Sequence, residues 1–148
     1  MKELSTKRPV CASFYCYTCV HSLDHLHVRR GHFEYGRTLA QAFAKLSPRP
    51  TAFVAVNDET AVGAQLEFQA LGLRVPQDLS ITGFDNVTPA WYDGPKLTTC
   101  AVPLEEIGAE AARFLYWRIE HPNATRRTLM LETELVEGET TGELKIEE

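Results

Sequence analysis

Apolar and polar positions follow two different spacings from about residue 36 onward. Residues 37–46, RTLAQAFAKL, carry apolar side chains at the spacing of one helix face, and two prolines follow the segment. Residues 51–56, TAFVAV, form a short continuous apolar run, which is typical of a parallel strand covered on both faces. Residues 59–71 return to the helical spacing and end at Gly72. This part of the chain therefore predicts a helix, a strand and a second helix.

The second half repeats the pattern. Residues 79–84, LSITGF, and residues 97–102 predict strands, and Pro103 opens a helix that runs to about Glu120. Residues 128–136 predict one or two closing strands. The apolar face expected on the last helix consists of Ile107, Ala111, Phe114, Leu115 and Ile119. Helices and strands that alternate with short links indicate an α/β fold, with an open, mainly parallel, Rossmann-like sheet flanked by helices.

Two of the predicted strands end in polar pairs. Asn57 and Asp58 follow the first strand, and Asp85 and Asn86 follow the second. In an open parallel sheet, ligands bind outside the carboxyl ends of the strands, where loops and helix N-termini converge. The sequence therefore predicts a ligand-binding rim at these two strand ends.

The members of these pairs differ in expected role. Asp58 directly precedes a helix and is a favoured N-cap, so we assign it as the helix cap. Asn57 is either a ligand contact, through an amide that both donates and accepts, or a turn former. Asp85 has no helix immediately after it, so it is either a ligand contact that accepts hydrogen bonds from hydroxyl or ring N–H groups, or a turn-stabilising aspartate.

Composition narrows the class of protein. A chain of 148 residues with 44% hydrophobic and 24% charged side chains is ordinary for one soluble globular domain. The formal net charge of −5 argues against a surface for nucleic-acid phosphate, which needs clustered Lys and Arg. No apolar run approaches the roughly 18 residues that span a bilayer, and the N-terminus lacks a signal-peptide core. We therefore expect a cytoplasmic protein with reduced cysteines and no membrane contact.

The first 30 residues carry no clear period, and we assign no fold to residues 1–30. Cys16 and Cys19 are followed by His21, His25 and His27, which raises the alternative of a zinc site. The spacing fits no standard zinc finger, and the competing interpretation is an irregular extension. We expect no metal site.

Enzymatic chemistry has no support in the motifs. The chain has no Gly-x-Gly-x-x-Gly after a strand, no Walker phosphate loop and no Gly-x-Ser-x-Gly elbow. Glu105 and Glu106 are adjacent on a helix, so their side chains point apart and suit a solvated surface better than acid–base catalysis. We predict that the protein is not an enzyme and uses no cofactor.

Several short motifs occur together in a distinctive order. They are Arg-Pro-Thr-Ala at 49–52, Asn57-Asp58, Gly-Leu-Arg-Val-Pro at 72–76, Gly-Phe-Asp-Asn at 83–86 and Leu-Thr-Thr at 97–99. In this order and spacing, residues 31–142 closely resemble the effector-binding domain of bacterial transcription regulators of the LacI/GalR type. The segment is similar to the second subdomain of their periplasmic-binding-protein-like fold, which implies one lobe of a two-lobed architecture. Residues 143–148 form a polar tail.

The resemblance implies roles for individual residues. Asn57 and Asp85 would hydrogen-bond a small effector, a sugar or a purine. Phe33 falls at the aromatic position that packs against the ligand ring, with a core phenylalanine as the alternative. The helix at 59–71, with Val62 and Leu66 on its outer stripe, lies where family members dimerise.

The same resemblance shapes the expected function. Family members begin with a helix-turn-helix, a hinge and a first subdomain, and none of these is found in this sequence. We therefore expect a truncated effector-sensing and dimerisation portion of a repressor that binds its effector weakly or undetectably and makes no direct DNA contact. Its partners would be a small effector and either a second copy or an intact homologue. The alternatives are a periplasmic-type solute-binding module and a non-functional fragment.

Overall fold

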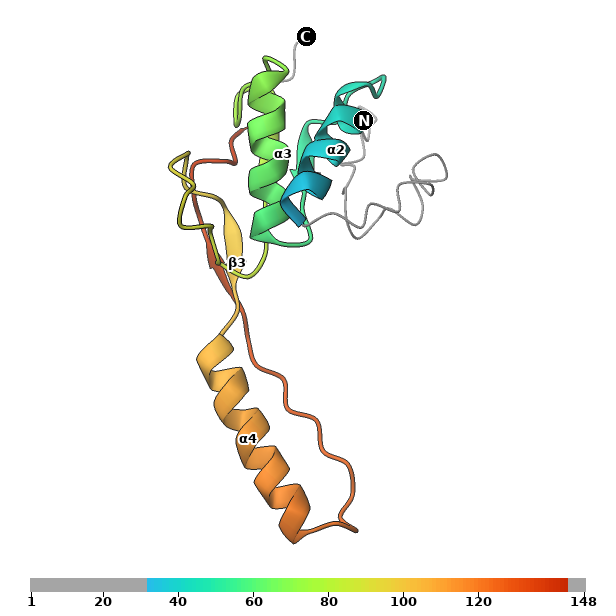
Figure 1. Cartoon of the computed structure of the whole chain (residues 1–148), viewed down its shortest axis with the longest axis vertical. Helices are drawn as coiled ribbons and strands as arrows, with labels where there is room; N and C mark the ends of the chain where they lie inside the picture. The colour runs from blue at the N-terminus through green and yellow to red at the C-terminus, as the bar shows by residue number, and fades with distance from the viewer. Residues whose placement is uncertain (1–31, 144–148) are drawn as a thin grey trace, which may run out of the picture.

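The computed structural model describes residues 32–143, which form a lobe and a projecting arm (Figure 1). The elements follow the order predicted from the sequence, with ends shifted by a few residues; the first helix begins earlier than expected. They are α2 (His32–Ala44), β1 (Ala52–Val54), α3 (Asp58–Ala70), β2 (Ser80–Thr82), β3 (Thr99–Ala101), α4 (Leu104–Glu120) and β4 (Glu134–Val136). The predicted N-terminal segment, including the cysteine and histidine cluster at residues 16–27, lies outside the described residues.

The strands form two small two-stranded sheets, β1 with β2 and β3 with β4, which are joined by isolated parallel bridges. β1 pairs in parallel with β2, and Ala52 lies opposite Ser80. Isolated parallel bridges, Thr82 to Thr98 and Asp85 to Ala101, join β2 to the chain at β3. β4 runs antiparallel to β3. This order, with helices beside the sheet, confirms the predicted α/β class.

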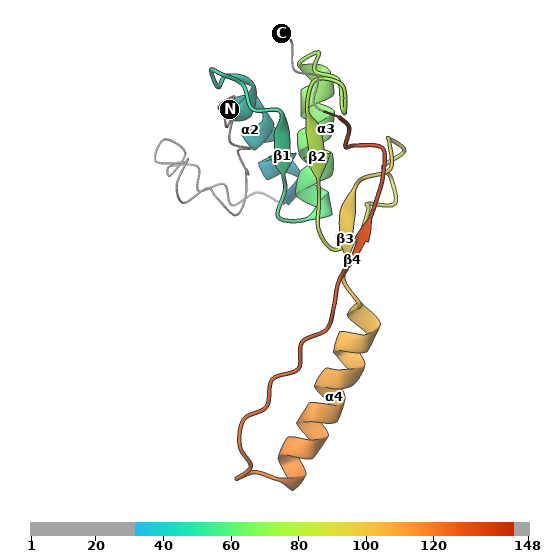
Figure 2. The same cartoon turned by 180° about the vertical axis from the view of Figure 1, so that it is seen from behind.

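Both helices of the lobe pack on the same face of the sheet (Figure 2). The core they enclose centres on Phe43, Phe53 and Phe68, whose rings meet edge to face with centroids 5.3–5.6 Å apart. This is a favoured arrangement for aromatic rings and adds to the effect of burying their area. Leu39, Leu79, Ile81 and Leu97 complete the buried cluster together with several alanines. The core is therefore supplied by α2, α3 and one face of the sheet.

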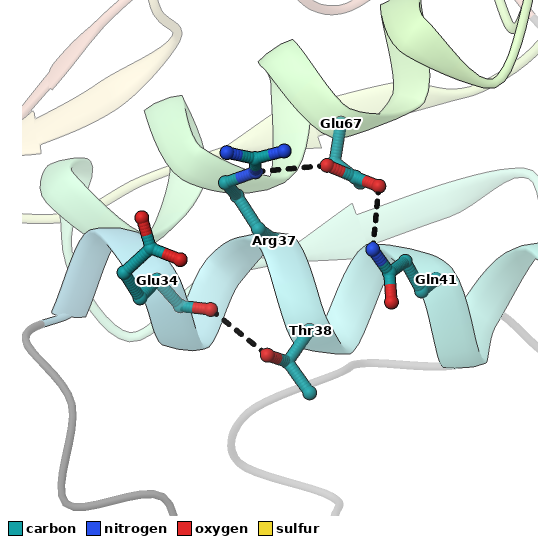
Figure 3. A network of polar contacts seen from close by, with 5 residues as sticks. All are labelled: Glu34, Arg37, Thr38, Gln41 and Glu67. Atoms are coloured by element: carbon teal, nitrogen blue, oxygen red, sulfur yellow. Dashed lines mark hydrogen bonds and ion pairs between the residues drawn. The ribbon is translucent and has the colours of Figure 1, made fainter.

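A network of polar contacts, the polar clamp, joins α2 to α3 at the edge of the core (Figure 3). Glu67 of α3 accepts hydrogen bonds from Gln41 Nε2 at 2.7 Å and from Arg37 Nε at 2.8 Å, both on α2. These two hydrogen bonds, the one from Gln41 first, lower the pKa of the Glu67 carboxyl below its ordinary value. The Glu67 side chain is buried, so the clamp satisfies a charge that would otherwise be costly.

The opposite face of the sheet is open, which corrects the expectation of strands covered on both faces. Val54, the last residue of β1, and Val56, two residues later, are 36% and 49% exposed. They line an apolar groove of about 520 Å³ with Phe84, Cys100 and Leu135. The continuous apolar run of residues 51–56 identified the strand, but among the described residues no helix covers this face.

The arm consists of α4 and the returning segment 121–133, and it projects away from the lobe (Figures 1 and 2). None of the residues of α4 is buried, so the face predicted from Ile107, Ala111, Phe114, Leu115 and Ile119 is not part of the core. The arm is held together near its tip: the guanidinium of Arg127 lies 4.0 Å from the ring centre of Trp117. Arg118 Nη1 also donates to the carbonyl oxygen of Ala124 at 2.7 Å.

Residues 32–143 were compared with the features expected of a membrane-spanning helix and of a metal site. No helix in that range is long and apolar enough to cross a membrane. The same residues contain no group of three or more His, Cys, Asp or Glu side chains arranged to hold a metal ion.

Candidate functional site

The carboxyl ends of β1 and β2 lie at the same edge of the sheet because the two strands are parallel. Asn57 and Asp58 follow β1, and Asp85 and Asn86 follow β2, as the sequence predicted. A backbone hydrogen bond from Asp58 N to Phe84 O, 3.0 Å long, joins the two turns directly. The four polar residues therefore gather on one rim.

Asn57 is the N-cap of α3, which corrects the assignment of that role to Asp58. Its backbone is extended, with φ −155° and ψ 169°, and its side-chain oxygen accepts a hydrogen bond from Thr60 N at 3.0 Å. This satisfies one of the N–H groups that a helix start leaves unpaired. Asp58 is instead the first residue of the helix, where its negative charge suits the helix dipole.

Asp58 connects three segments from a buried position. Its Oδ1 accepts a hydrogen bond from Thr99 Oγ1 at 2.6 Å, and its Oδ2 accepts one from Val87 N at 2.7 Å. Gly83 lies against this carboxylate so closely that a Cβ at that position would overlap Asp58 Oδ1. The Asp58 side chain thus ties the start of α3 to β3 and to the loop after β2.

Burial raises the pKa of the Asp58 carboxyl above its ordinary value. The hydrogen bonds from Thr99 and Val87 favour the ionised form and oppose this shift, while the neighbouring charge of Asp85 adds to it. Asp58 itself serves the structure of the rim, because both of its oxygens are occupied by protein groups.

Asp85 adopts an unusual backbone conformation. Its φ is 103°, and that of the next residue, Asn86, is 58°. Side chains other than glycine adopt positive φ at a cost of about 1–3 kcal/mol, and such strain gathers at binding sites. The turn is held by Asp85 N donating to Cys100 O at 2.9 Å. The half-buried Asp85 carboxylate makes no hydrogen bond or ion pair within residues 32–143.

An aromatic pair lies beside this rim. The half-buried Phe33, near the start of α2, meets Trp91 edge to face, with ring centroids 5.2 Å apart. Trp91 is on the loop that follows Asp85 and Asn86, and 58% of it is exposed. Phe33 is not a member of the main core cluster, and Trp91 was not foreseen from the sequence. The only sequence feature that could have pointed to Trp91 is the adjacent pair of aromatic residues, Trp91 and Tyr92, in a loop that shows no periodicity.

The dimer contact expected on α3 is corrected in part. Val62 is fully buried within the chain, so it cannot lie on an outer stripe that contacts a partner. Leu66, the other residue assigned to that contact, is half-buried. The broad apolar composition of α3 therefore reflects burial on several sides rather than a free dimerisation face.

Comparison with protein families identifies this arrangement. The family described as "Periplasmic binding protein-like domain" matches residues 17–141. The match begins within the segment that the sequence analysis left unassigned and extends through all the elements of the lobe and the arm.

Named relatives narrow the type of protein. The chain is 43% identical over 113 residues to the ribose operon repressor of Haemophilus influenzae, which covers 76% of this chain and 34% of that protein. It is 35% identical over 121 residues to the HTH-type transcriptional repressor PurR of Vibrio vulnificus, covering 80% of this chain and 36% of the relative. Both relatives are regulators rather than enzymes. The chain therefore spans about a third of the length of these proteins.

Solved structures show the same architecture. A LacI family transcriptional regulator from Enterococcus faecalis with bound ribose superposes with a TM-score of 0.69 at 33% identity, covering 76% of this chain and 42% of that one. The lac repressor dimer bound to operator superposes with a TM-score of 0.64 at 27% identity, covering 73% of this chain and 37% of the other. These likenesses agree with one lobe of a periplasmic-binding-protein-like fold.

Proposed function

Because the chain belongs to the LacI family of transcriptional regulators, through their periplasmic-binding-protein-like effector domain, we propose that it senses a small effector at the rim formed by Asn57 and Asp85. The observation that carries this function is the Asp85 carboxylate. It sits on a positive-φ turn at a strand end and has no hydrogen-bond partner among residues 32–143. A strained turn that presents a carboxylate in this way suits a ligand with hydroxyl or N–H donors.

The effector we favour is ribose or a closely related sugar. The relative named as the ribose operon repressor is 43% identical, and a matching regulator structure contains ribose. Vicinal hydroxyl groups can donate two hydrogen bonds to one ionised carboxylate, which is the geometry Asp85 offers. Asn57 caps α3 through its side-chain oxygen at the same rim, and its side-chain amide carries N–H donors of the kind that a sugar oxygen accepts.

A purine is the second candidate. The PurR repressor of Vibrio vulnificus is 35% identical to this chain. An aromatic surface suits a planar base, and the pair formed by Phe33 and Trp91 supplies one beside the rim. A ring N–H of the base would donate to the Asp85 carboxylate in place of the sugar hydroxyls.

The effector would lie half in solvent, because the described residues form a single lobe. Affinity of a small ligand depends on enclosing most of its surface, so one rim gives weak binding. We propose a partner role alongside sensing, in which the chain pairs with a second copy or with an intact homologue in the cytoplasm. DNA contact by this chain is not part of the proposal, since its net charge of −5 opposes phosphate binding.

A titration followed by nuclear magnetic resonance tests the sensing role. Ribose should shift the amide signals around residues 57 and 85 with a Kd of about 1–10 mM, a range in which calorimetry gives little heat. Asp85→Ala should abolish the shifts. Asp93→Ala, which removes an exposed carboxylate from the same loop, is the matched control and should leave them unchanged.

The outcomes separate the parts of this proposal. Shifts produced by hypoxanthine or guanine instead of ribose would select the purine. A low-micromolar Kd would contradict a half-enclosed site. Equal shifts in the Asp85→Ala variant would remove Asp85 from the site, and an absence of shifts with every sugar and base at about 50 mM would overturn effector binding by this chain.

A further inference from the structure

A glutamine is buried in the lobe without a hydrogen-bond partner. Gln65 lies on α3 and is fully buried, and neither its side-chain oxygen nor its side-chain nitrogen forms a hydrogen bond within residues 32–143. The carboxylates of the same helix that are buried, Asp58 and Glu67, are hydrogen-bonded. Thr60 Oγ1 is also unpaired, but Gln65 leaves both a donor and an acceptor without a partner. Native proteins contain few such groups, because water satisfies them in the unfolded chain.

Tyr92, on the loop after Asp85, lies beside Gln65. Burial raises the pKa of the Tyr92 hydroxyl to about 12, and the Gln65 side chain opposes this rise, which requires the two groups to be close. They do not reach hydrogen-bond geometry, since both Gln65 atoms remain unpaired. Tyr92 Oη instead donates to the carbonyl oxygen of Pro95 at 3.1 Å, inside its own loop. A small displacement of the Tyr92 ring would therefore give the Gln65 amide a partner.

Residues 88–95, which we term the rim loop, are fixed at their two ends. Val87 N, just before the loop, donates to Asp58 Oδ2 at 2.7 Å. Lys96 N, just after it, donates to a carboxylate of the C-terminal segment at 2.9 Å. Between these points, the hydrogen bonds in the described part of the chain stay inside the loop, and both involve Tyr92. Movement of the loop is therefore confined to its middle, where Tyr92 lies.

The position of Tyr92 also determines the position of Trp91. The Tyr92 ring lies so close to the loop backbone that a Cβ at Gly94 would overlap it. Trp91 directly precedes Tyr92 and meets the ring of Phe33 edge to face. Because the Tyr92 ring and the loop backbone are in contact, a shift of Tyr92 toward α3 moves the middle of the rim loop as a unit. Trp91 then moves relative to Phe33.

We propose that Gln65 and Tyr92 form a latch that gives the rim loop two positions. In the open position, which the structure shows, the Tyr92 hydroxyl donates to Pro95 O and Gln65 is unpaired. In the closed position the hydroxyl donates to Gln65 Oε1, and water satisfies the Pro95 carbonyl on the surface loop. The exchange keeps the number of hydrogen bonds made by Tyr92 but pairs a fully buried group, so both positions are populated. The edge-to-face contact of Trp91 with Phe33 belongs to the open position.

The latch operates in the chain without a ligand, and its consequence for sensing rests on the proposed function. A planar base that contacts Phe33 and Trp91 would bind one position of the rim loop better than the other and would shift the population toward it. The experiments on the latch use no effector. Failure of effector binding and failure of the latch are therefore separate results.

Fluorine nuclear magnetic resonance of the full chain measures the two loop positions. Trp117→Phe leaves Trp91 as the only tryptophan, which is labelled as 5-fluorotryptophan. Two signals, or one signal with relaxation dispersion, are expected for two interconverting positions. Gln65→Leu removes both unpaired atoms and should lower the closed population at least about tenfold, which leaves one signal without dispersion. Gln69→Leu, the same change at an exposed glutamine one turn later on α3, is the matched control and should leave the exchange unchanged.

A double-mutant cycle tests the pairing itself. Tyr92→Phe removes only the hydroxyl, so the effect of Gln65→Leu on the folding equilibrium constant should differ at least about threefold between the Tyr92→Phe background and the unmodified chain. Additive effects would overturn the pairing. A single fluorine signal without dispersion in the Trp117→Phe chain, exchange that persists in Gln65→Leu, or equal loss of exchange in Gln69→Leu would overturn the two positions. Circular dichroism first establishes that each variant is folded, and Gln65→Met replaces Gln65→Leu if the latter is not.

Discussion

The lobe and the arm each contain a helix of similar overall hydropathy, but the two helices differ completely in burial. In α3 nine residues are buried, whereas in α4 none is buried. Helix α3 is covered by α2 on one side and by the sheet on another, so even its polar residues Asp58, Thr60 and Gln65 lie inside. Helix α4 has the clearer single apolar stripe, but within the described residues its Leu115 and Ile119 are 64% and 69% exposed. The spacing of apolar residues therefore indicates which side chains favour burial, but whether they are buried depends on the elements that pack against the helix.

The largest difference in stability between the two regions is expected when an apolar side chain is removed from each. Phe68→Ala removes a fully buried ring that contacts Phe43 and Phe53, and it should lower the free energy of unfolding by about 3–5 kcal/mol. Leu115→Ala removes an exposed side chain and should change it by less than about 0.5 kcal/mol at low protein concentration. Urea unfolding measures both effects.

The two tryptophans allow the regions to be followed separately. Trp91 is in the lobe and Trp117 is in the arm, so Trp117→Phe and Trp91→Phe backgrounds give one fluorescent probe for each. If Phe68→Ala proves too unstable to fold, Phe68→Leu provides a milder variant with the same direction. Equal losses from Phe68→Ala and Leu115→Ala would mean that the arm is packed as tightly as the lobe.

A smaller effect is expected at the rim. Asp58→Ala leaves the Val87 N–H and the buried Thr99 hydroxyl without their acceptor, and leaving a buried group unpaired costs about 1–3 kcal/mol. Asp93→Ala removes an exposed carboxylate from the loop after β2 and should cost less than about 0.5 kcal/mol. A loss below 0.5 kcal/mol for Asp58→Ala in the same urea assay would show that its buried hydrogen bonds do not hold the rim.

The sequence predicted the elements of both regions but not all of their contacts. Helical and strand spacings located every helix and strand from residue 36 onward, because each short segment carries its own pattern. The polar residues at the strand ends were also foreseen, since a turn must follow a buried strand. These features depend on local sequence, which a single chain displays in full.

Contacts that depend on distant segments were missed. Asn57 caps α3 in place of Asp58, because a shift of one residue in the helix start decides which side chain caps it. Val62 was assigned to an outer surface but is buried, although nothing in α3 alone distinguishes its two sides. The contact of Trp91 with Phe33 joins a loop to a helix 58 residues earlier, and no periodicity encodes it. The alternative of a zinc site at residues 16–27 lies outside the described residues.

The pH dependence of stability should distinguish the two buried carboxylates of the lobe. The folded pKa of Asp58 is raised by burial, so its contribution to stability is fully present below about pH 4 and is lost as pH rises through the folded pKa. The folded pKa of Glu67 is lowered by Gln41 and Arg37, so its contribution is present above about pH 4.3 and is lost as pH falls.

Urea unfolding midpoints measured between about pH 3 and 7 test these opposite signs. Relative to the unmodified chain, Asp58→Asn should gain stability as pH rises through this range, and Glu67→Gln should gain stability as pH falls. The reason is that ionisation of Asp58 destabilises the folded state, whereas ionisation of Glu67 stabilises it. The same direction of change in both variants would contradict one of the two assignments.

The smallest effect, and the sharpest test of the arm, is Gly108→Ala. The added methyl group meets no atom of the chain, so the variant should stabilise α4 locally by up to about 1 kcal/mol, through the helix propensity of alanine and the reduced freedom of the unfolded chain. Because α4 lies outside the core, hydrogen exchange of its amides should slow while the urea midpoint of the lobe stays unchanged. Slower exchange in α4 without a change in the lobe would therefore separate what this helix needs for its own folding from what the core of the lobe requires.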